Sequence, residues 1–183
     1  MASFQHIGIV GCSAPGAALC HQTICTEGAQ LLGEKYAHPE ISMHTHAMAE
    51  YMPHIESGNW KGVADLMLSS AEKLAKIGAD FLICPDNTIH EAFEHLESRS
   101  PLPWLHIAEE VASEAKRLQC RRVALLGTKF LMEGSVYHPY FERAGIDYRT
   151  PNPEERERIN QFIFDEMVEG RFTVEARTYF SGV

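Results

Sequence analysis

The sequence predicts an α/β fold in which parallel strands are flanked by helices. Short apolar runs alternate with longer amphipathic runs along the whole 183 residues. Short apolar runs are typical of strands buried on both faces, and their alternation with helices is typical of parallel sheets. Glycines and prolines end many of these runs, where turns are expected.

Strands are expected at the apolar runs. They cover residues 7–11, 41–48, 79–84, 104–107, 122–128 and 146–149. Apolar residues at helical spacing place helices at residues 17–32, 59–77, 108–118, 135–144 and 154–169, with a last helix from Thr173. Another helix is expected to begin at Asn87 or Thr88, because Thr88 and Glu91 have the spacing of a capping box.

The composition is that of a soluble globular protein, with 45% hydrophobic and 22% charged residues. A net charge of −9, from 16 basic and 25 acidic residues, argues against a nucleic-acid-binding surface. No apolar run reaches the roughly 20 residues of a membrane span, and the first residues lack the pattern of a secretory signal. The five cysteines form no Cys-x-x-Cys pair, which favours reduced thiols. We therefore expect a cytoplasmic protein without nucleic-acid or membrane partners.

A proline-marked connection at residues 99–103 divides the chain in two. The apolar run at residues 122–128 echoes the one at residues 7–11. The sequence therefore predicts a first α/β lobe at residues 1–100 and a second at residues 101–183. If the second lobe copies the first, it should continue to one more strand, so we expect it to be truncated before its last strand.

The stretch from Ile83 to His90 concentrates polar groups at one turn. Cys84, Asp86, Asn87 and Thr88 lie within five residues, where a buried strand ends and a helix is expected to begin. In open α/β sheets small ligands bind at such places, and free N–H groups of a helix favour an anion. The same residue types also suit an ordinary capped turn, so both interpretations stay open.

Two other segments carry polar side chains near expected strand ends. Ser13 is the expected N-cap of the first helix, and Pro15 and Gly16 suit its first turn. His44 and His46 alternate on an expected strand, so both side chains should point to one side. Such a pair can bind zinc, but no third ligand is evident, which favours a pocket wall or a solvated face.

Three stretches together resemble the aspartate/glutamate racemase family, the cofactor-independent amino-acid racemases, along nearly the whole chain. The first stretch is Ile-Gly-Ile-Val-Gly-Cys-Ser-Ala-Pro-Gly-Ala, which begins at Ile7. The second is Asn87-Thr88-Ile89-His90, the Asn-Thr-x-His signature. The third is Leu-Leu-Gly-Thr-Lys-Phe-Leu-Met-Glu at residues 125–133, followed by Tyr137 and Gly145.

The resemblance implies two pseudosymmetric Rossmann-like lobes with parallel sheets, a homodimer, and a small amino-acid or dicarboxylate substrate in the cleft between lobes. It implies no cofactor and no metal. In the family, two cysteines face opposite sides of the substrate's α-carbon, because inverting a stereocentre by proton transfer needs an acid and a base on opposite faces. A helix N-terminus beside the turn would help to ionise a cysteine there.

The chain departs from the family pattern at both catalytic positions. Asp86 stands where relatives commonly have the first cysteine, directly before Asn87, and Cys84 is the nearest thiol. A carboxylate with a pKa of roughly 3.9 is a weak base, and burial would raise that value. Asp86 could also be a local turn residue, and Cys84 fits a buried strand-end thiol. The family's second cysteine lies in a Gly-Cys-Thr-Glu-like motif after the last helix seen here, and Cys120 is no substitute.

The candidate site follows from the motif positions. The expected catalytic residues are Asp86 and, as a weaker candidate, Cys84. The expected substrate-binding residues are Asn87, Thr88, Thr128, Ser13, Pro15, Gly16, His44 and His46. Leu131 stands where relatives often have a second threonine, so part of the contact at Thr128 is altered.

The leading hypothesis is a cofactor-independent, racemase-like isomerase for aspartate, glutamate or another small α-amino acid, acting by two-base proton transfer. One alternative is a homologue that binds amino acids or other small molecules without racemising them. Another is different carbanion chemistry on the same fold, such as decarboxylation or maleate isomerisation. The substrate itself depends on pocket shape and single polar contacts.

Overall fold

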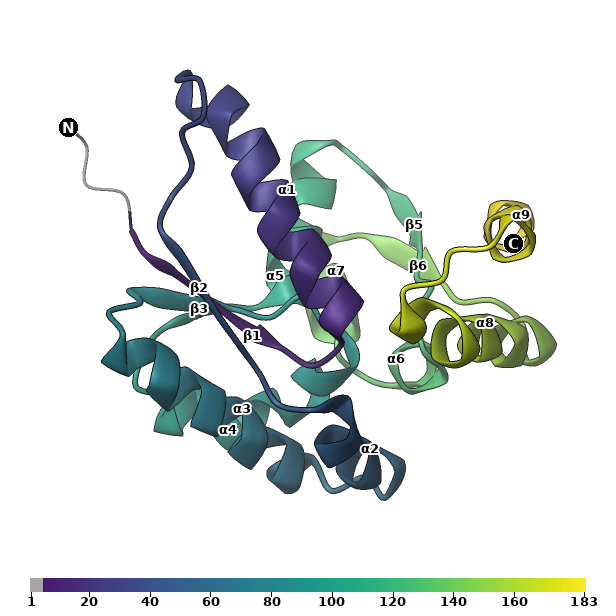
Figure 1. The fold of residues 1–183 in the computed structure, drawn as a ribbon. Coiled ribbons are helices and arrows are strands. Elements are labelled where there is room, and N and C mark those ends of the chain that lie inside the picture. The colour runs from purple at the N-terminus through teal and green to yellow at the C-terminus, as the bar shows by residue number, and fades with distance from the viewer. Residues whose placement is uncertain (1–4) are drawn as a thin grey trace. The chain divides into compact units, whose positions relative to one another are not determined.

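The computed structural model describes residues 5–183, and these divide into two compact units. Unit 1 ends at His106, and unit 2 covers Ile107–Val183. Figure 1 shows strands and helices alternating along the chain. The α/β class with parallel sheets and flanking helices is confirmed. The predicted boundary between residues 100 and 101 stays a prediction.

Unit 1 contains a four-stranded parallel sheet. Its strands are β1 (Ile7–Gly11), β2 (Ile41–Thr45), β3 (Phe81–Ile83) and β4 (Trp104–Leu105), in the order β2-β1-β3-β4. The central strands are the most apolar, and Ile9, Val10 and Leu82 are fully buried. This burial explains why their sequences read as continuous apolar runs.

Helices cover both faces of this sheet. They are α1 (Ala14–Leu32), α2 (Met48–Glu56), α3 (Trp60–Lys76) and α4 (Phe93–Leu96), with short 3₁₀ segments at Thr88–Ala92 and Glu97–Arg99. From β1 the chain moves to β2, and it then crosses back to β3 on the other side of β1. Right-handed crossovers in opposite directions place α1 on one face and α3 with α4 on the other, as Figure 1 shows. The direction of winding therefore reverses between β1 and β3, which makes this the switch point of the sheet.

Helix α3 shows how local sequence sets an element's ends. The side chain of Asn59 accepts a hydrogen bond from the backbone N–H of Gly62 at 3.1 Å, which caps the first turn. Val63, Met67 and Leu74 are fully buried on one face. Gly78, with φ +93°, allows the chain to turn away just after the helix. The predicted helix at residues 59–77 is confirmed to within one residue at each end.

Two local predictions in unit 1 are wrong. The predicted strand 41–48 ends at Thr45, and the following residues form helix α2, in spite of Pro53 inside it. The segment after Asn87 starts as a 3₁₀ helix and not as an α-helix. Asn87 itself has helical dihedrals and makes no side-chain capping bond, and the capping box predicted for Thr88 and Glu91 stays a prediction.

Gly11 brings the start of α1 against the end of β1. A Cβ at this position would overlap the methyl group of Thr45 and lie 2.8 Å from the Cβ of Ala17. Only glycine leaves room for this approach. As a result, the turn formed by Cys12 and Ser13 lies directly at the carboxyl edge of the sheet.

Unit 2 is built around two parallel strands, β5 (Arg122–Ala124) and β6 (Asp147–Arg149). Its helices are α5 (Ile107–Arg117), α6 (Lys129–Glu133), α7 (His138–Ala144), α8 (Pro153–Asp165) and α9 (Val174–Gly182), with a 3₁₀ turn at Met167–Glu169. Helix α5 packs against α7, and the core between these elements includes Ala112, Leu125 and Phe141. The strand predicted at residues 122–128 ends at Ala124, and a turn connects it to α6, which begins at Lys129.

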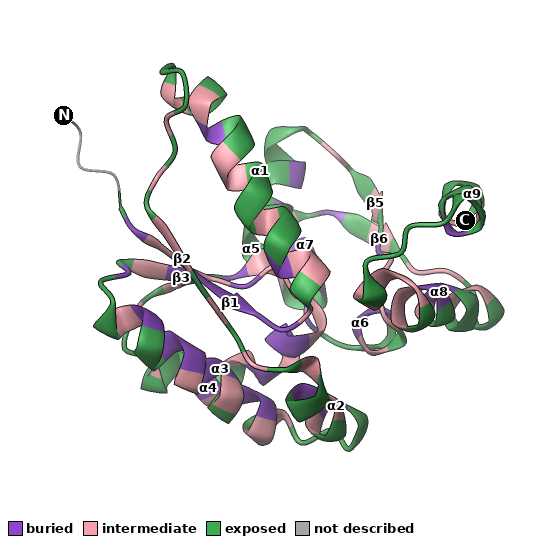
Figure 2. Cartoon of the chain, in the orientation of Figure 1, coloured by how far each residue is buried: buried purple, intermediate pink, exposed green. Residues whose placement is uncertain are grey.

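Burial differs between the helices of unit 1. Figure 2 shows a continuous buried face on α3, whereas α1 is largely exposed. On α1 only Ala17 and Gly28 are buried, and Leu19 and Leu31 are 61% and 86% exposed. Among residues 5–183, no helix combines the length and the apolar character that crossing a membrane requires.

Candidate active site

The carboxyl ends of β1 and β3 bring two turns together at the switch point of unit 1. Cys12 and Ser13 follow β1, and Asp86 lies three residues after the end of β3. The backbone N–H of Cys12 donates to Oδ2 of Asp86 at 2.8 Å, and that of Ser13 donates to Oδ1 at 3.0 Å. The Asp86 side chain thus bridges two segments more than 70 residues apart in sequence, at the edge where ligands bind in open α/β sheets.

The environment of Asp86 changes its proton affinity. Burial raises the pKa of its carboxyl group above the ordinary 3.8, while the backbone N–H of Cys12 and the hydroxyl and N–H groups of Ser13 act in the opposite direction. Asp86 still keeps part of its surface accessible. A carboxylate that is partly accessible and has a raised pKa is a candidate acid/base group.

The backbone carbonyl of Asp86 is also held. Its oxygen lies 2.9 Å from Nδ1 of His90 and 3.7 Å from Sγ of Cys84. His90 and Cys84 are both buried. The peptide of Asp86 is therefore fixed from its carbonyl side, while its carboxylate is fixed by the turn after β1.

The surroundings of the Cys84 thiol disfavour its ionised form. Burial and the negative charge of Asp86 raise its pKa well above the ordinary value of 9.0. The segment that follows the turn is a short 3₁₀ helix, and burial outweighs any lowering of the Cys84 pKa by its N-terminus. A protonated thiol can donate to the Asp86 carbonyl but is a poor base, so the chemistry favours Asp86 over Cys84.

Asn87 and Thr88 lie beside Asp86, as expected. Asn87 precedes the 3₁₀ segment and Thr88 is its first residue, and both are half-buried. On the opposite turn, Pro15 and Gly16 belong to the first turn of α1. A Cβ at Gly16 would lie 2.6 Å from Oγ of Ser13 and 3.8 Å from Oδ1 of Asp86, so Gly16 leaves space beside the carboxylate.

Ser13 occupies the N-cap position of α1 but does not cap it. Its side chain makes no capping hydrogen bond, although the residue has the extended dihedrals expected there. Its backbone N–H and its hydroxyl interact with Asp86 instead. The predicted capping role is therefore replaced by a contact across the switch point.

His44 and His46 lie at the end of β2 and contact α3. Their rings pack edge to face with centroids 5.0 Å apart, so they do share one side. Nδ1 of His44 lies 2.9 Å from Oγ of Ser70, and Nε2 lies 3.0 Å from Nζ of Lys73. Because a lysine ammonium can only donate, the Nε2 atom accepts and the ring is neutral, with its proton on Nδ1. Burial, Lys73 and His46 all lower the pKa of His44.

A metal centre is not evident in the part of the chain that the structure describes. No group of three or more His, Cys, Asp or Glu side chains among residues 5–183 could hold a metal ion. For His46, the neighbouring polar atoms are Oγ of Ser69 at 3.2 Å and Oε1 of Glu50 at 3.6 Å. The two histidines thus form part of a polar wall along β2 and α3.

Thr128 belongs to unit 2, where it caps helix α6. Its side-chain oxygen accepts a hydrogen bond from the backbone N–H of Leu131 at 3.2 Å. Leu131 is buried, in agreement with a core position. The backbone N–H of Lys129 donates to Oδ1 of Asn160 at 2.8 Å, which ties this turn to α8. A role in substrate binding for Thr128 stays a prediction.

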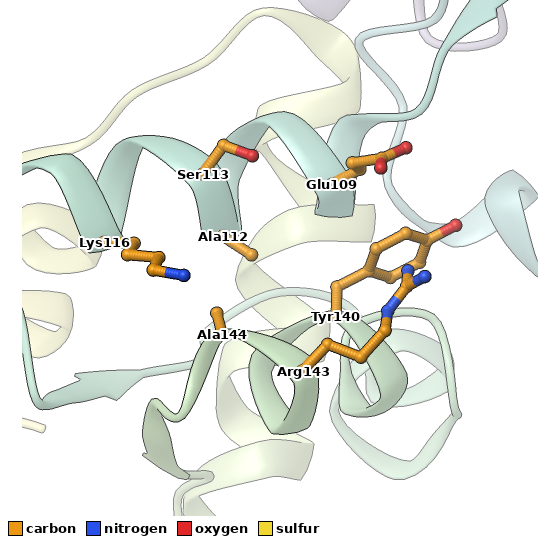
Figure 3. A pocket seen from close by; sticks show the side chains of 7 residues that line it. All are labelled: Glu109, Ala112, Ser113, Lys116, Tyr140, Arg143 and Ala144. Carbon is orange, nitrogen blue, oxygen red and sulfur yellow. The ribbon is translucent and has the colours of Figure 1, made fainter.

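Unit 2 contains a surface pocket between α5 and α7. Figure 3 shows its lining between α5 and α7, where the guanidinium of Arg143 lies over the ring of Tyr140, 4.7 Å from its centroid. The residues that line it are Glu109, Ala112, Ser113, Lys116, Tyr140, Arg143 and Ala144. None of these is a predicted site residue.

Two residues near Asp86 were not predicted to take part in the site. His90 belongs to the Asn-Thr-x-His signature, which could have indicated it. Tyr51 of α2 is fully buried, and its pKa is raised by burial and then by Cys84, Cys12 and Asp86. Its hydroxyl makes no hydrogen bond of normal geometry, although its interaction with the Ser70 side chain lowers the pKa. No sequence signal indicated Tyr51, because its helix was not predicted.

Comparisons with known proteins bear on the fold of the chain and on its family. The crystal structure of a candidate Asp/Glu racemase from Yersinia pestis matches 97% of this chain and 77% of its own, with a TM-score of 0.81 and 26% identity. An aspartate racemase homologue from Pyrococcus horikoshii matches 92% of this chain and 74% of its own, with a TM-score of 0.75 and 30% identity. An aspartate racemase from Picrophilus torridus, at 17% identity and a TM-score of 0.73, shares the fold.

Sequence comparison gives the same family. The broad-specificity amino-acid racemase RacX of Bacillus subtilis is 30% identical over 79 residues, which is 43% of this chain. The match spans about a third, 34%, of RacX. The family model for Asp/Glu/hydantoin racemases matches residues 24–183. The chain therefore belongs to the Asp/Glu/hydantoin racemase family.

Proposed function

We propose that the protein is a cofactor-independent, racemase-like isomerase that moves the α-proton of aspartate, glutamate or another small α-amino acid. Asp86 is the acid/base group at one face of the α-carbon in this proposal. Family membership supports racemase-like chemistry in general. The observation that carries the specific proposal is the Asp86 carboxylate, which is partly accessible, has a raised pKa and lies at the switch point of the sheet.

The raised pKa matters because general-base catalysis improves as the proton affinity of the base rises toward the working pH. An ordinary aspartate is ionised at neutral pH but accepts a proton weakly. Burial shifts Asp86 in the useful direction, and the N–H groups of Cys12 and Ser13 keep it oriented. Cys84, which stays protonated, is the weaker candidate.

Residues on both sides of Asp86 would bind the substrate. Asn87 and Thr88 offer an amide and a hydroxyl to the α-carboxylate, where negative charge grows as the α-proton leaves. Gly16 leaves space beside the Asp86 carboxylate for a substrate atom. The remaining predicted contacts are Ser13, Pro15, His44, His46 and Thr128. A homodimer and a cytoplasmic location remain part of the proposal.

The test is exchange of the substrate's α-proton with solvent. Enantiomers of aspartate and glutamate are incubated with the protein in D₂O, and α-deuterium is followed by NMR. Exchange that is lost in Asp86→Asn and retained in Cys84→Ala supports Asp86 as the base. Retention in Asp86→Asn with loss in Cys84→Ala would transfer the role to the thiol.

A second function is favoured by one observation. Both carboxylate oxygens of Asp86 already accept a backbone N–H, which is also what a structural clamp does. In that case the protein would bind amino acids or dicarboxylates without moving a proton. Saturable binding of aspartate by calorimetry, without any α-deuterium, would identify this function, and turnover of maleate or an arylmalonate would indicate other carbanion chemistry.

A further inference from the structure

His90 has a defined hydrogen-bonding role at the Asp86 turn. Its side chain is 3% exposed, and Nδ1 lies 2.9 Å from the backbone carbonyl oxygen of Asp86. A carbonyl oxygen can only accept, so Nδ1 carries a proton and donates it. The imidazole is therefore oriented by the residue four positions earlier in the chain.

The surroundings of His90 keep the ring neutral and in one orientation. The ring stacks on Phe93 with an interplanar angle of 5°, and the edge of His106 packs against it with centroids 4.7 Å apart. Burial, followed by the nearby His106, lowers the pKa of His90 to about 4. At neutral pH the ring has one proton, which the carbonyl of Asp86 holds on Nδ1, and the backbone of Asn87 also interacts with the ring.

The hydrogen bond from His90 acts on Asp86, which is held through both its carboxylate and its backbone carbonyl. The carboxylate of Asp86 is bound by the N–H groups of Cys12 and Ser13, and its carbonyl is bound by His90 and contacted by Cys84. If the carbonyl is released, the peptide can rotate, and both carboxylate contacts then lengthen. The buried His90 donor is thus in a position to influence the carboxylate through the peptide of Asp86.

We propose that His90 is the positioning residue for Asp86, and that its Nδ1–H holds the Asp86 peptide so that the carboxylate faces the turn after β1. The inference rests on the proposed function of Asp86 as an acid/base group. His90 acts through Asp86 and does not touch the substrate. This gives the histidine of the Asn-Thr-x-His signature a physical role in this chain.

The experiment compares two amides of different reach. In His90→Asn the side-chain N–H₂ takes the place of Nδ1, whereas in His90→Gln it lies one carbon further out, near the place of Nε2. Phe93→Leu is the matched control, since it removes the stacked ring and leaves the donor. All three variants keep the buried turn free of a new charge.

The main measurement is hydrogen exchange at the backbone N–H groups of Cys12 and Ser13, divided by exchange at Ile9 in the core of β1. The ratio removes changes in global stability. We expect His90→Gln to raise this ratio about tenfold, the effect of losing one hydrogen bond, and His90→Asn and Phe93→Leu to leave it near the wild-type value. The pKa of Asp86, followed by the ¹³C shift of its carboxyl carbon, should rise further above its ordinary value only in His90→Gln, because the N–H contacts that lower it are weakened.

Several results would overturn the proposal. One is equal exchange ratios in His90→Asn and His90→Gln, with an unchanged titration of Asp86, which would make His90 a packing residue. Another is a shift in Phe93→Leu as large as that in His90→Gln. The proposed function can fail independently of this proposal. In that case the hydrogen-exchange ratios change as expected, but neither the wild type nor any variant moves an α-proton. Where α-proton exchange is present, kcat should fall in His90→Gln with KM little changed, and His90→Asn should restore it.

Discussion

The carboxylate of Asp86 accepts the backbone N–H of Cys12 at 2.8 Å, across the point where the winding of the sheet reverses. The bond joins the turn after β1 to the turn after β3. In the same residue, burial raises the proton affinity of the carboxylate. A structural contact and a candidate catalytic group thus coincide in one side chain, and several predictions separate the two roles.

Removal of the side chain should destabilise the fold. In Asp86→Ala the N–H groups of Cys12 and Ser13 lose their acceptors, so we expect a loss of about 1–3 kcal/mol in the free energy of unfolding. Urea unfolding measures this directly. Asp86→Asn keeps one amide oxygen as acceptor and should lose less, and equal losses in the two variants would argue against the clamp.

The pH dependence of stability should show the raised pKa of Asp86. The folded protein holds the proton of this carboxyl more tightly than the unfolded chain does, so the contribution of Asp86 falls as pH rises from its ordinary pKa of 3.8 to its raised value. The free energy of unfolding of the wild type minus that of Asp86→Asn should therefore decrease over this window. A difference that increases there would mean that the pKa is lowered.

His90, in contrast, should make the folded protein less stable as the pH falls. Its pKa is lowered from 6.5 to about 4, so the unfolded chain binds the proton first, and stability is lost as pH falls through this range. At about 1.4 kcal/mol for each pKa unit, the effect amounts to roughly 3 kcal/mol. Thermal unfolding of the wild type and His90→Asn from pH 7 to pH 4 tests it, and parallel curves for the two proteins would contradict it.

The hydroxyl of Tyr51 should contribute little to stability. It is buried and makes no hydrogen bond of normal geometry, so Tyr51→Phe should change the free energy of unfolding by no more than about 0.5 kcal/mol. Ser70→Ala tests the neighbouring hydroxyl, which interacts with Tyr51 and also accepts from Nδ1 of His44 at 2.9 Å and donates to the carbonyl of Leu66 at 3.3 Å. It should cost about 1 kcal/mol or more. A larger loss in Tyr51→Phe would show that the hydroxyl is bonded in solution.

Much of the fold could be predicted because its signals are local. Helix α3 begins at an asparagine cap and ends before a glycine with positive φ, and its buried residues recur at helical spacing. Helix α2 was missed because Pro53 reads as a helix breaker. The 3₁₀ segment after Asn87 was taken for an α-helix, because the spacing of Thr88 and Glu91 does not distinguish the two.

The site could be predicted only in part. The turn at Asp86 stands out in the sequence, since polar residues there interrupt an apolar run. Its partners Cys12 and Ser13 lie 74 and 73 residues away, so only the strand order of the sheet brings them together. Burial sets the direction of the pKa shift at Cys84. The sequence indicates that this thiol is buried, but it does not give the extent of burial on which the shift depends.

The central claim is that Asp86 transfers the α-proton of an amino acid, and α-deuterium incorporation in D₂O tests it most directly. The account predicts that wild-type protein incorporates deuterium into aspartate, glutamate or another small amino acid, and that Asp86→Asn lowers the rate by about 100-fold or more, as expected when a general base is removed. Equal rates in the two proteins, or no incorporation by the wild type into any amino acid it binds, would contradict the claim.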